Sequence, residues 1–233
     1  MECVFAVFGQ ITVMERQGRT MTEAVRDRDS VAAEMEQIAE EIRVCTKCDL
    51  CKMRTQAVPG DGPTDAALMF IGEAPGFHED RQGHPFIGAA GKLLDDLLAS
   101  IDMDRSQVFV TNVVKCRPPG NRDPLPDEVQ TCTSNYLKRQ VALLNPRMIV
   151  LLGRFSMEQF FPGEKISKIH GQPRQADGRM YFPMYHPAAA LHQPRWLEDV
   201  KLDMLKIPAL LEEAKRIAPP EPDEPEPEQL SLF

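Results

Sequence analysis

Short apolar runs alternate with amphipathic segments along most of this chain. Each run is bounded by turn residues, as is typical of a buried strand, and the runs are residues 67–71, 108–114, 148–152 and 180–185. Apolar residues also recur at helical spacing, in residues 90–101, 127–144, 155–160 and 196–216. Because strands that alternate with helices form crossover units, we expect an α/β fold with a largely parallel sheet and helices on both faces.

The two ends of the chain are patterned differently from this middle part. Residues 21–44 combine helical spacing with many charges and predict an amphipathic N-terminal helix. Residues 1–20 show little pattern, so we expect a disordered extension there. Residues 217–228 are acidic and rich in proline, which predicts an extended linker ahead of residues 229–233. One folded domain is therefore expected over residues 45–216.

Composition and charge narrow the class of protein. The chain has 233 residues, 42% of them hydrophobic, and a net charge of -8. No stretch approaches the roughly 20 apolar residues of a membrane span, and the start lacks a signal-peptide pattern, so we expect a cytoplasmic protein. The negative charge at first argues against nucleic acid as a partner. However, five of these charges lie near the C-terminus, on Glu221, Asp223, Glu224, Glu226 and Glu228. Subtracting them from -8 leaves only -3 for the rest of the chain, so nucleic acid remains possible.

The cysteines indicate a metal centre. There are six in a chain without an export signal, which argues against a disulfide framework. Cys45 and Cys48 form a C-x2-C pair, whereas Cys116 and Cys132 come from distant parts of the chain. Four thiolates suit either a structural zinc or an iron–sulfur cluster, and the wide spacing of the second pair favours the cluster without deciding between them. The two remaining cysteines are interpreted as spare thiols: Cys3 and Cys51.

Polar residues and glycines follow three of the predicted strands. Residues 72–76 (GEAPG) form a turn whose glycines allow a ligand close to the backbone. Asn112 offers a donor and an acceptor side by side, which suits the edge of a nucleobase. His186 follows the last strand and is held by Pro187. The turn alone is as often structural as functional, and a lone Asn or His is more often structural. Ligands of parallel sheets, however, bind at the carboxyl ends of strands, where a His-Pro favours function, so together these features predict a binding site.

Five ordered blocks resemble the family 4 uracil-DNA glycosylases, the iron–sulfur branch of the uracil-DNA glycosylase superfamily. They are Cys45-Thr-Lys-Cys48, the GEAPG turn, GHPFIGAAGKLL, TNVVKCRPPGNR followed by PLPDE, and His186-Pro187. The resemblance covers residue 45 to about residue 214. It implies a three-layer α/β/α fold around a four-stranded, mainly parallel sheet. It also implies a [4Fe-4S] cluster, without Cys51 as a ligand, that is held by Cys45, Cys48, Cys116 and Cys132.

The resemblance further implies a monofunctional enzyme that flips uracil out of single- or double-stranded DNA and hydrolyses its N-glycosidic bond, which starts base excision repair. Phe86 would stack on the base, Asn112 would read its O4 and N3–H edge, and His186 would stabilise negative charge at O2. Glu73 would orient water or oppose positive charge on the sugar. Ala74 stands where family 1 enzymes have an Asp, so that position offers no carboxylate base. The further substrate-binding positions are Gly72, Ala74 and Glu79. The predicted DNA contacts are Lys115, Arg117, Arg122 and, as a wedge, Leu191.

The end of the chain suggests a protein partner. Gln229-Leu230-Ser231-Leu232-Phe233 resembles the peptide with which bacterial repair proteins bind the DNA polymerase III sliding clamp. The enzyme itself is expected to be a monomer. Two other functions are considered: a non-catalytic iron–sulfur DNA-binding or clamp-associated adaptor, and a superfamily relative that acts on another damaged base. The intact pocket set of Phe86, Asn112 and His186 argues against the adaptor.

Overall fold

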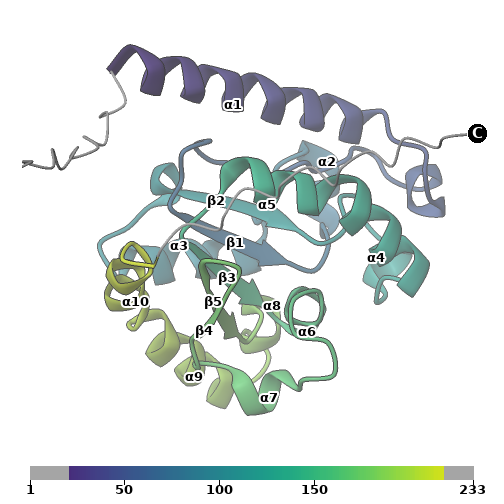
Figure 1. Cartoon of the computed structure of the whole chain (residues 1–233). Coiled ribbons are helices and arrows are strands. Elements are labelled where there is room, and N and C mark those ends of the chain that lie inside the picture. The colour runs from purple at the N-terminus through teal and green to yellow at the C-terminus, as the bar shows by residue number, and fades with distance from the viewer. Residues whose placement is uncertain (1–20, 218–233) are drawn as a thin grey trace, which may run out of the picture.

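The computed structural model describes residues 21–217, with side chains from residue 28 onward. A five-stranded sheet with the order β2-β1-β3-β5-β4 forms the centre of the fold (Figure 1). Four strands are parallel, and β4 pairs antiparallel with β5 at one edge. The strands are β1 (Leu68–Gly72), β2 (Val108–Asn112), β3 (Met148–Leu152), β4 (Arg174–Ala176) and β5 (Arg179–Met184). The predicted α/β class and the four parallel strands are confirmed, whereas the fifth strand was not predicted because it is short and only partly buried.

The strand register brings the carboxyl ends of the parallel strands to one edge of the sheet. Gly72 at the end of β1 lies opposite Asn112 at the end of β2, and Leu152 on β3 lies opposite Met184 on β5. The chain continues from β1 to β2 on one side and then crosses to β3 on the other side of β1. Such a reversal of direction opens a crevice beyond the strand ends, where ligands of α/β sheets bind.

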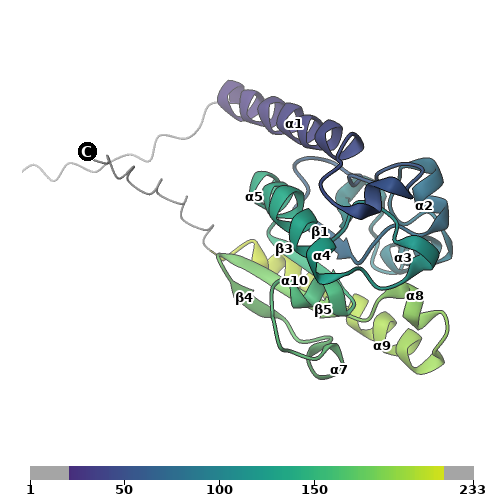
Figure 2. The same ribbon diagram turned by 90° about the vertical axis from the view of Figure 1, so that its right-hand side faces the viewer.

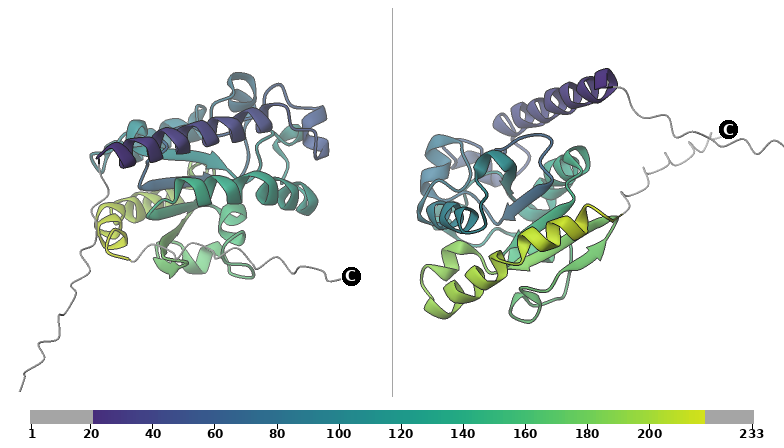
Figure 3. Two further views of the ribbon diagram at one scale, coloured as in Figure 1. Left: turned by 45° about the horizontal axis from the view of Figure 1, so that its top comes forward. Right: turned by 90° about the vertical axis from the view of Figure 1, so that its left-hand side faces the viewer.

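Helices on one face of the sheet pack against α1 (Met21–Arg43). In Figure 3 this long helix runs beside α5 (Lys138–Leu144), and α4 (Pro126–Cys132) and α6 (Arg154–Glu158) belong to the same layer. The α1 side chains Met35, Ile38 and Ile42 are buried against this layer. The charged, amphipathic helix predicted from the sequence is therefore part of the core through one apolar stripe.

Three other helices cover the second face, as Figure 2 shows from the side. They are α3 (Ala89–Ala99), α9 (Pro194–Met204) and α10 (Ile207–Ala214). Leu94, Leu98 and Val200 are buried there against alternate residues of the strands. Both faces of the sheet are thus covered by helices, which explains why the sequences of the central strands are continuous apolar runs.

Two predicted helices are interrupted in the structure. The segment predicted over residues 127–144 contains a π-helical turn, η4 (Thr133–Leu137), directly after Cys132. The segment predicted over residues 196–216 breaks before α10, because Pro208 lacks a backbone N–H and its ring excludes a continuous helix. Both departures are local changes within correctly predicted helical regions.

The remaining elements are short and lie near the strand ends or in connections. They are α2 (Phe77–Gln82), α7 (Ile166–Ile169), α8 (Pro187–Ala190), η1 (Asp49–Lys52), η2 (Arg105–Gln107) and η3 (Pro119–Asn121). Over residues 21–217, no helix has the length and apolar character needed to span a membrane. The predicted extension over residues 1–20, most of the acidic linker and the C-terminal peptide lie outside the described residues.

Candidate functional site

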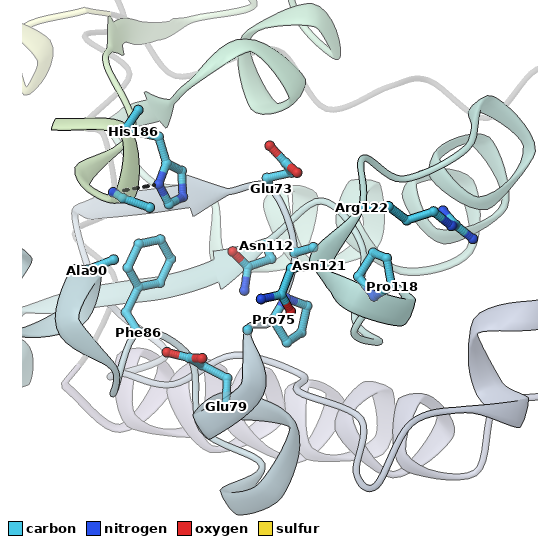
Figure 4. Close-up of a pocket in the computed structure, with 14 residues that line it drawn as sticks. Glu73, Pro75, Glu79, Phe86, Ala90, Asn112, Pro118, Asn121, Arg122 and His186 are labelled. Atoms are coloured by element: carbon cyan, nitrogen blue, oxygen red, sulfur yellow. Dashed lines mark hydrogen bonds between the residues drawn. The ribbon is translucent and has the colours of Figure 1, made fainter. Parts of the chain in front are cut away.

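A pocket of about 310 Å³ opens beyond the carboxyl ends of the strands. Figure 4 shows Phe86, Asn112 and His186 around the same space, with Glu73 and Glu79 on its walls. The lining residues are Glu73, Ala74, Pro75, Gly76, Glu79, Phe86, Ala90, Asn112, Pro118, Asn121, Arg122, His186, Ala188 and Ala189. The fold thus brings together side chains that the sequence places more than 100 residues apart.

Gly72 allows two of these side chains to approach each other. A Cβ atom at this position would lie 2.4 Å from Oδ1 of Asn112 and 2.6 Å from Cζ of Phe86. Gly72 therefore does not line the pocket itself but makes room for the residues that do. Oδ1 of Asn112 is buried and has no hydrogen-bond partner among the described residues. A buried acceptor of this kind costs free energy unless a ligand satisfies it.

Phe86 is held in an unusual backbone conformation. Its φ angle is 53°, in the left-handed region that non-glycine residues seldom adopt. Its carbonyl oxygen accepts a hydrogen bond from Nη2 of Arg105 at 2.8 Å, and Nε of Arg105 donates to Oδ1 of Asp95 at 2.5 Å. A Cβ atom on Gly91 would lie 1.7 Å from that carbonyl oxygen. Arg105 and Gly91 thus position the phenyl ring, although neither was predicted as a site residue.

His186 faces the pocket in a defined orientation. Its Nδ1 accepts a hydrogen bond from the backbone N–H of Ala188 at 3.1 Å, and its ring stacks on Phe86 with the centroids 5.5 Å apart. A Cβ atom on Gly153, the residue directly after β3, would lie only 3.0 Å from Cβ of His186. Burial lowers the pKa of His186 to about 4, while the negative charge of Glu79 opposes this change. The imidazole is therefore neutral near pH 7.

The two pocket carboxylates differ in environment. Glu79 Oε1 accepts hydrogen bonds from the amides of Ile87 and Gly88 at 3.0 and 2.9 Å, which fixes it against the wall. Burial, helped by the negative charge of Asp123, raises the pKa of Glu73 to about 7, and Arg154 acts in the opposite direction. Glu73 can therefore change its charge near neutral pH.

The predicted DNA contacts fall in very different places. The prediction for Lys115 is wrong, because only 1% of this residue is exposed. Its Nζ donates to Oγ1 of Thr111, the carbonyl oxygen of Asn112 and Oε1 of Gln140 at 2.6, 2.8 and 2.6 Å. Because Asn112 is one of these partners, Lys115 supports the strand end that carries the pocket amide.

The other three remain accessible. Arg122 lines the pocket, but its guanidinium makes two hydrogen bonds to the buried carboxylate of Glu128, at 2.9 and 2.7 Å. Arg117 is partly exposed and donates to Oδ1 of Asn121 at 2.6 Å. Leu191 follows α8 and is 45% exposed. For these residues, DNA contact stays a prediction.

Five cysteines gather around a second, smaller cavity between α1, η1 and α4. Cys45, Cys48, Cys116 and Cys132 line it together with Cys51. Within residues 21–217, no three His, Cys, Asp or Glu side chains are grouped closely enough to hold one metal ion. The convergence of the two distant cysteine pairs could not be deduced from their spacing, and it also brings Cys51, predicted to be spare, to the same wall.

N–H donors point at these sulfur atoms. Nη1 of Arg54 lies 3.0 Å from Sγ of Cys116, and the amide of Lys115 lies 3.3 Å from Sγ of Cys132. Burial raises the pKa of the Cys132 thiol to about 12, and the charge of Lys115 and its amide act against this rise. Buried sulfur atoms that accept hydrogen bonds and face a common cavity suit the ligand set of an iron–sulfur cluster.

Comparisons with known proteins agree with this geometry. The family model of the Uracil DNA glycosylase superfamily matches residues 59–207. A type-4 uracil-DNA glycosylase of Sulfurisphaera tokodaii is 46% identical over 196 residues, which cover 78% of this chain and 87% of that protein. Type-4 uracil-DNA glycosylases of Archaeoglobus fulgidus (45% identical; 74% of this chain, 91% of that protein) and Saccharolobus solfataricus (47%; 73% and 83%) are similarly close.

Proposed function

The chain belongs to the Uracil DNA glycosylase superfamily as a type-4 uracil-DNA glycosylase, and we propose that the pocket beyond the strand ends is where it excises uracil from DNA. The unpartnered Oδ1 of Asn112 beside Phe86 and His186 is the observation that carries this proposal. A base within a duplex must leave the stack before its glycosidic bond is accessible. The pocket of about 310 Å³ has room for one such base.

Recognition of uracil rests on Asn112 and Phe86. The amide of Asn112 accepts from N3–H of uracil and donates to O4, and Phe86 stacks on the base. Cytosine presents the opposite pattern, an acceptor at N3 and a donor at position 4, so a fixed amide leaves its own polar atoms unpaired with cytosine. The wall formed by Gly76 and the immobilised carboxylate of Glu79 excludes the methyl group of thymine.

Catalysis rests on His186 and Glu73. As the bond between C1′ of the sugar and N1 of uracil breaks, its electron pair passes to the base and places negative charge on O2. His186 donates from Nε2–H to this oxygen, and such a preorganised donor contributes roughly 3 kcal/mol. Water adds to C1′, and its proton passes to the departing uracil. Ionised Glu73 stabilises the positive charge that develops on the sugar, and it orients the attacking water.

The test is a panel of oligonucleotides that carry U:G, U:A, single-stranded U, hypoxanthine or T:G, with strand breaks revealed by alkali. We expect cleavage at uracil and none at thymine. Asn112→Asp should lose discrimination against cytosine, because a carboxylate in place of the amide changes the donor pattern. Cleavage only at hypoxanthine would indicate a relative with another substrate. A wild-type protein that binds DNA but cleaves no member of the panel would indicate the adaptor.

We assign a [4Fe-4S] cluster to the cysteine cavity, with Cys45, Cys48, Cys116 and Cys132 as ligands. In such a cluster each thiolate binds a different iron atom, so the sulfur atoms need not surround one ion. The cluster would supply structural cross-linking between the segment that follows α1, the loop after β2 and α4. Arg54 and the amide of Lys115 would donate hydrogen bonds to its sulfur ligands.

Residues 229–233 are proposed to bind the DNA polymerase III sliding clamp. The support is sequence alone: Leu230, Leu232 and Phe233 are apolar anchors at the end of an acidic, proline-rich segment. An extended linker over residues 219–228 would reach roughly 30 Å, which raises the local concentration of the enzyme at replication sites. The double variant Leu232→Ala, Phe233→Ala should lose clamp binding in pull-down assays and keep cleavage of short uracil oligonucleotides. Unchanged clamp binding by that variant would contradict this assignment.

A further inference from the structure

An aromatic residue with two arginines stands at the rim of the uracil pocket. Phe77 directly follows Gly76, which lines the pocket. The Phe77 residue is 48% exposed. Cζ of Arg117 lies 5.2 Å from the centroid of the Phe77 ring, and Cζ of Arg81 lies 5.6 Å from it. Arg81 belongs to α2, whereas Arg117 comes from the loop after β2. The exposed ring thus holds together two cations from segments far apart in the sequence.

The charges of these two arginines are not neutralised by carboxylates. No ion pair in the described part of the chain includes Arg81 or Arg117. Other arginines near the pocket differ in this respect, since Arg122 and Arg154 pair with Glu128 and Asp123. Arg81 is exposed and Arg117 is partly exposed, so both unpaired guanidinium groups are available for an external anion, and their planar forks match phosphate oxygens.

Contact with Phe77 orders the two side chains before a ligand arrives. A guanidinium over an aromatic face gains attraction without giving up its N–H donors, which lie in the guanidinium plane. Nε of Arg117 is further fixed by Oδ1 of Asn121, at 2.6 Å, and Asn121 itself lines the pocket. Side chains that are already ordered lose less conformational entropy on binding.

We propose that Phe77 holds Arg81 and Arg117 as a two-cation clamp for backbone phosphates of the DNA strand beside the flipped uracil. The inference rests on the proposed function, because the clamp lies at the rim where the DNA must pass. A body with a net charge near -3, obtained by removing the five acidic residues of the tail from -8, needs a local positive patch to approach a polyanion. Arg81 and Phe77 extend the DNA surface beyond the residues predicted from the sequence.

Binding to a uracil-free duplex, measured by fluorescence anisotropy at several salt concentrations, tests the clamp. The slope of log K against log salt is negative, and each phosphate contact that is lost makes it less steep by about one. We therefore expect about tenfold weaker binding for Arg81→Ala and for Arg117→Ala, and a slope reduced by about two for the double variant. Arg147→Ala, which removes the same charge just before β3 at the opposite end of the sheet, is the matched control. A double variant whose slope equals that of the control would overturn the clamp.

The role of Phe77 needs its own variants. Phe77→Leu keeps an apolar side chain but removes the aromatic face. It should weaken binding less in the Arg117→Ala background than in the wild type, because only Arg81 then remains to be ordered. Full additivity of Phe77→Leu and Arg117→Ala in a double-mutant cycle would overturn the ordering role. These measurements use DNA without uracil, so they test the clamp separately from the proposed function. The proposed function is contradicted only if the wild-type protein leaves uracil oligonucleotides intact.

Discussion

The backbone N–H of Ala188 donates to Nδ1 of His186 at 3.1 Å, and this contact selects the tautomer of the imidazole. An amide N–H can only donate, so Nδ1 carries no proton, and the single proton of the neutral ring is on Nε2. Burial lowers the pKa of His186 to about 4, which keeps this neutral form at physiological pH. The pocket therefore contains a neutral hydrogen-bond donor rather than a cation.

Replacing His186 should impair the chemical step more than binding. His186→Ala removes the Nε2–H donor, and we expect single-turnover cleavage to slow by about a hundredfold or more. His192→Ala, which removes an exposed histidine from the following segment, is the control and should retain activity. The neutral donor would be contradicted if the wild-type rate fell as the pH was lowered through about 6.5, the ordinary pKa of histidine, and if His186→Ala showed no such fall.

Glu73 should give the reaction its pH dependence near neutrality. Its carboxyl has a pKa of about 7 through burial and the nearby charge of Asp123, and the ionised form is the one proposed to act. Cleavage should therefore rise with pH through about 7 in the wild type, and this rise should be absent in Glu73→Gln. Measurement of kcat/KM between pH 5 and pH 9 checks both profiles.

The same group predicts an effect on stability. Because the pKa of Glu73 is raised above its ordinary 4.5, the folded state holds this proton more tightly than the unfolded state does. The contribution of Glu73 to stability is therefore present below pH 4.5 and is lost as the pH rises to about 7. Relative to Glu73→Gln, the Tm of the wild type should decrease over that interval. A difference in Tm that does not change with pH would count against the raised pKa.

Gly72→Ala should disable the pocket while the fold survives. The new Cβ would lie 2.4 Å from Oδ1 of Asn112 and 2.6 Å from Cζ of Phe86, so at least one of these side chains must move. Misplacement of this size can cost about a hundredfold in kcat/KM. Gly163→Ala places its new Cβ in open space but strains a backbone with a φ of 83°, so it shows whether lost stability alone lowers activity, and it should retain activity.

Arg105 should act on substrate binding through Phe86. Arg105→Met removes the hydrogen bond to the Phe86 carbonyl oxygen and the pair with Asp95. Because the stacked base is bound before the bond breaks, we expect KM to rise by about tenfold with a smaller effect on kcat. Arg105→Lys, which retains a donor, should recover part of the loss. Equal kinetics in wild type and Arg105→Met would remove Arg105 from the positioning role.

The two types of cysteine around the metal cavity can be distinguished by metal content. Cys116→Ala should lose the broad visible absorbance of an iron–sulfur protein, whereas Cys51→Ala should retain it with about four iron atoms per chain. Both cysteines line the cavity, so the pair is matched in position. A colourless wild-type protein that carries zinc would contradict the cluster, and loss of iron from Cys51→Ala would change the ligand set.

Much of the fold and part of the site could be predicted because they depend on local patterns. The parallel strands appear as apolar runs. Asn112 is recognisable as a polar residue within the second run, at the end of its strand, and His186 directly follows the last run. In contrast, Arg105 is an ordinary charged residue in a connecting segment, and only the folded chain brings it beside Asp95 of α3 and the carbonyl oxygen of Phe86. No local signal distinguishes it from an exposed arginine.

The sequence by itself determined the order of strands and helices and the kinds of chemical groups at the strand ends, because spacing, turn residues and apolar content are properties of neighbouring residues. Only the tertiary structure decided which groups meet, which are buried and which remain charged. Lys115 shows the difference. Its place in the sequence near Arg117 predicts a DNA contact, but its Nζ is buried and donates to Oε1 of Gln140 on α5 and to the carbonyl oxygen of Asn112. Burial and pKa depend on such long-range neighbours, which the chain acquires only on folding.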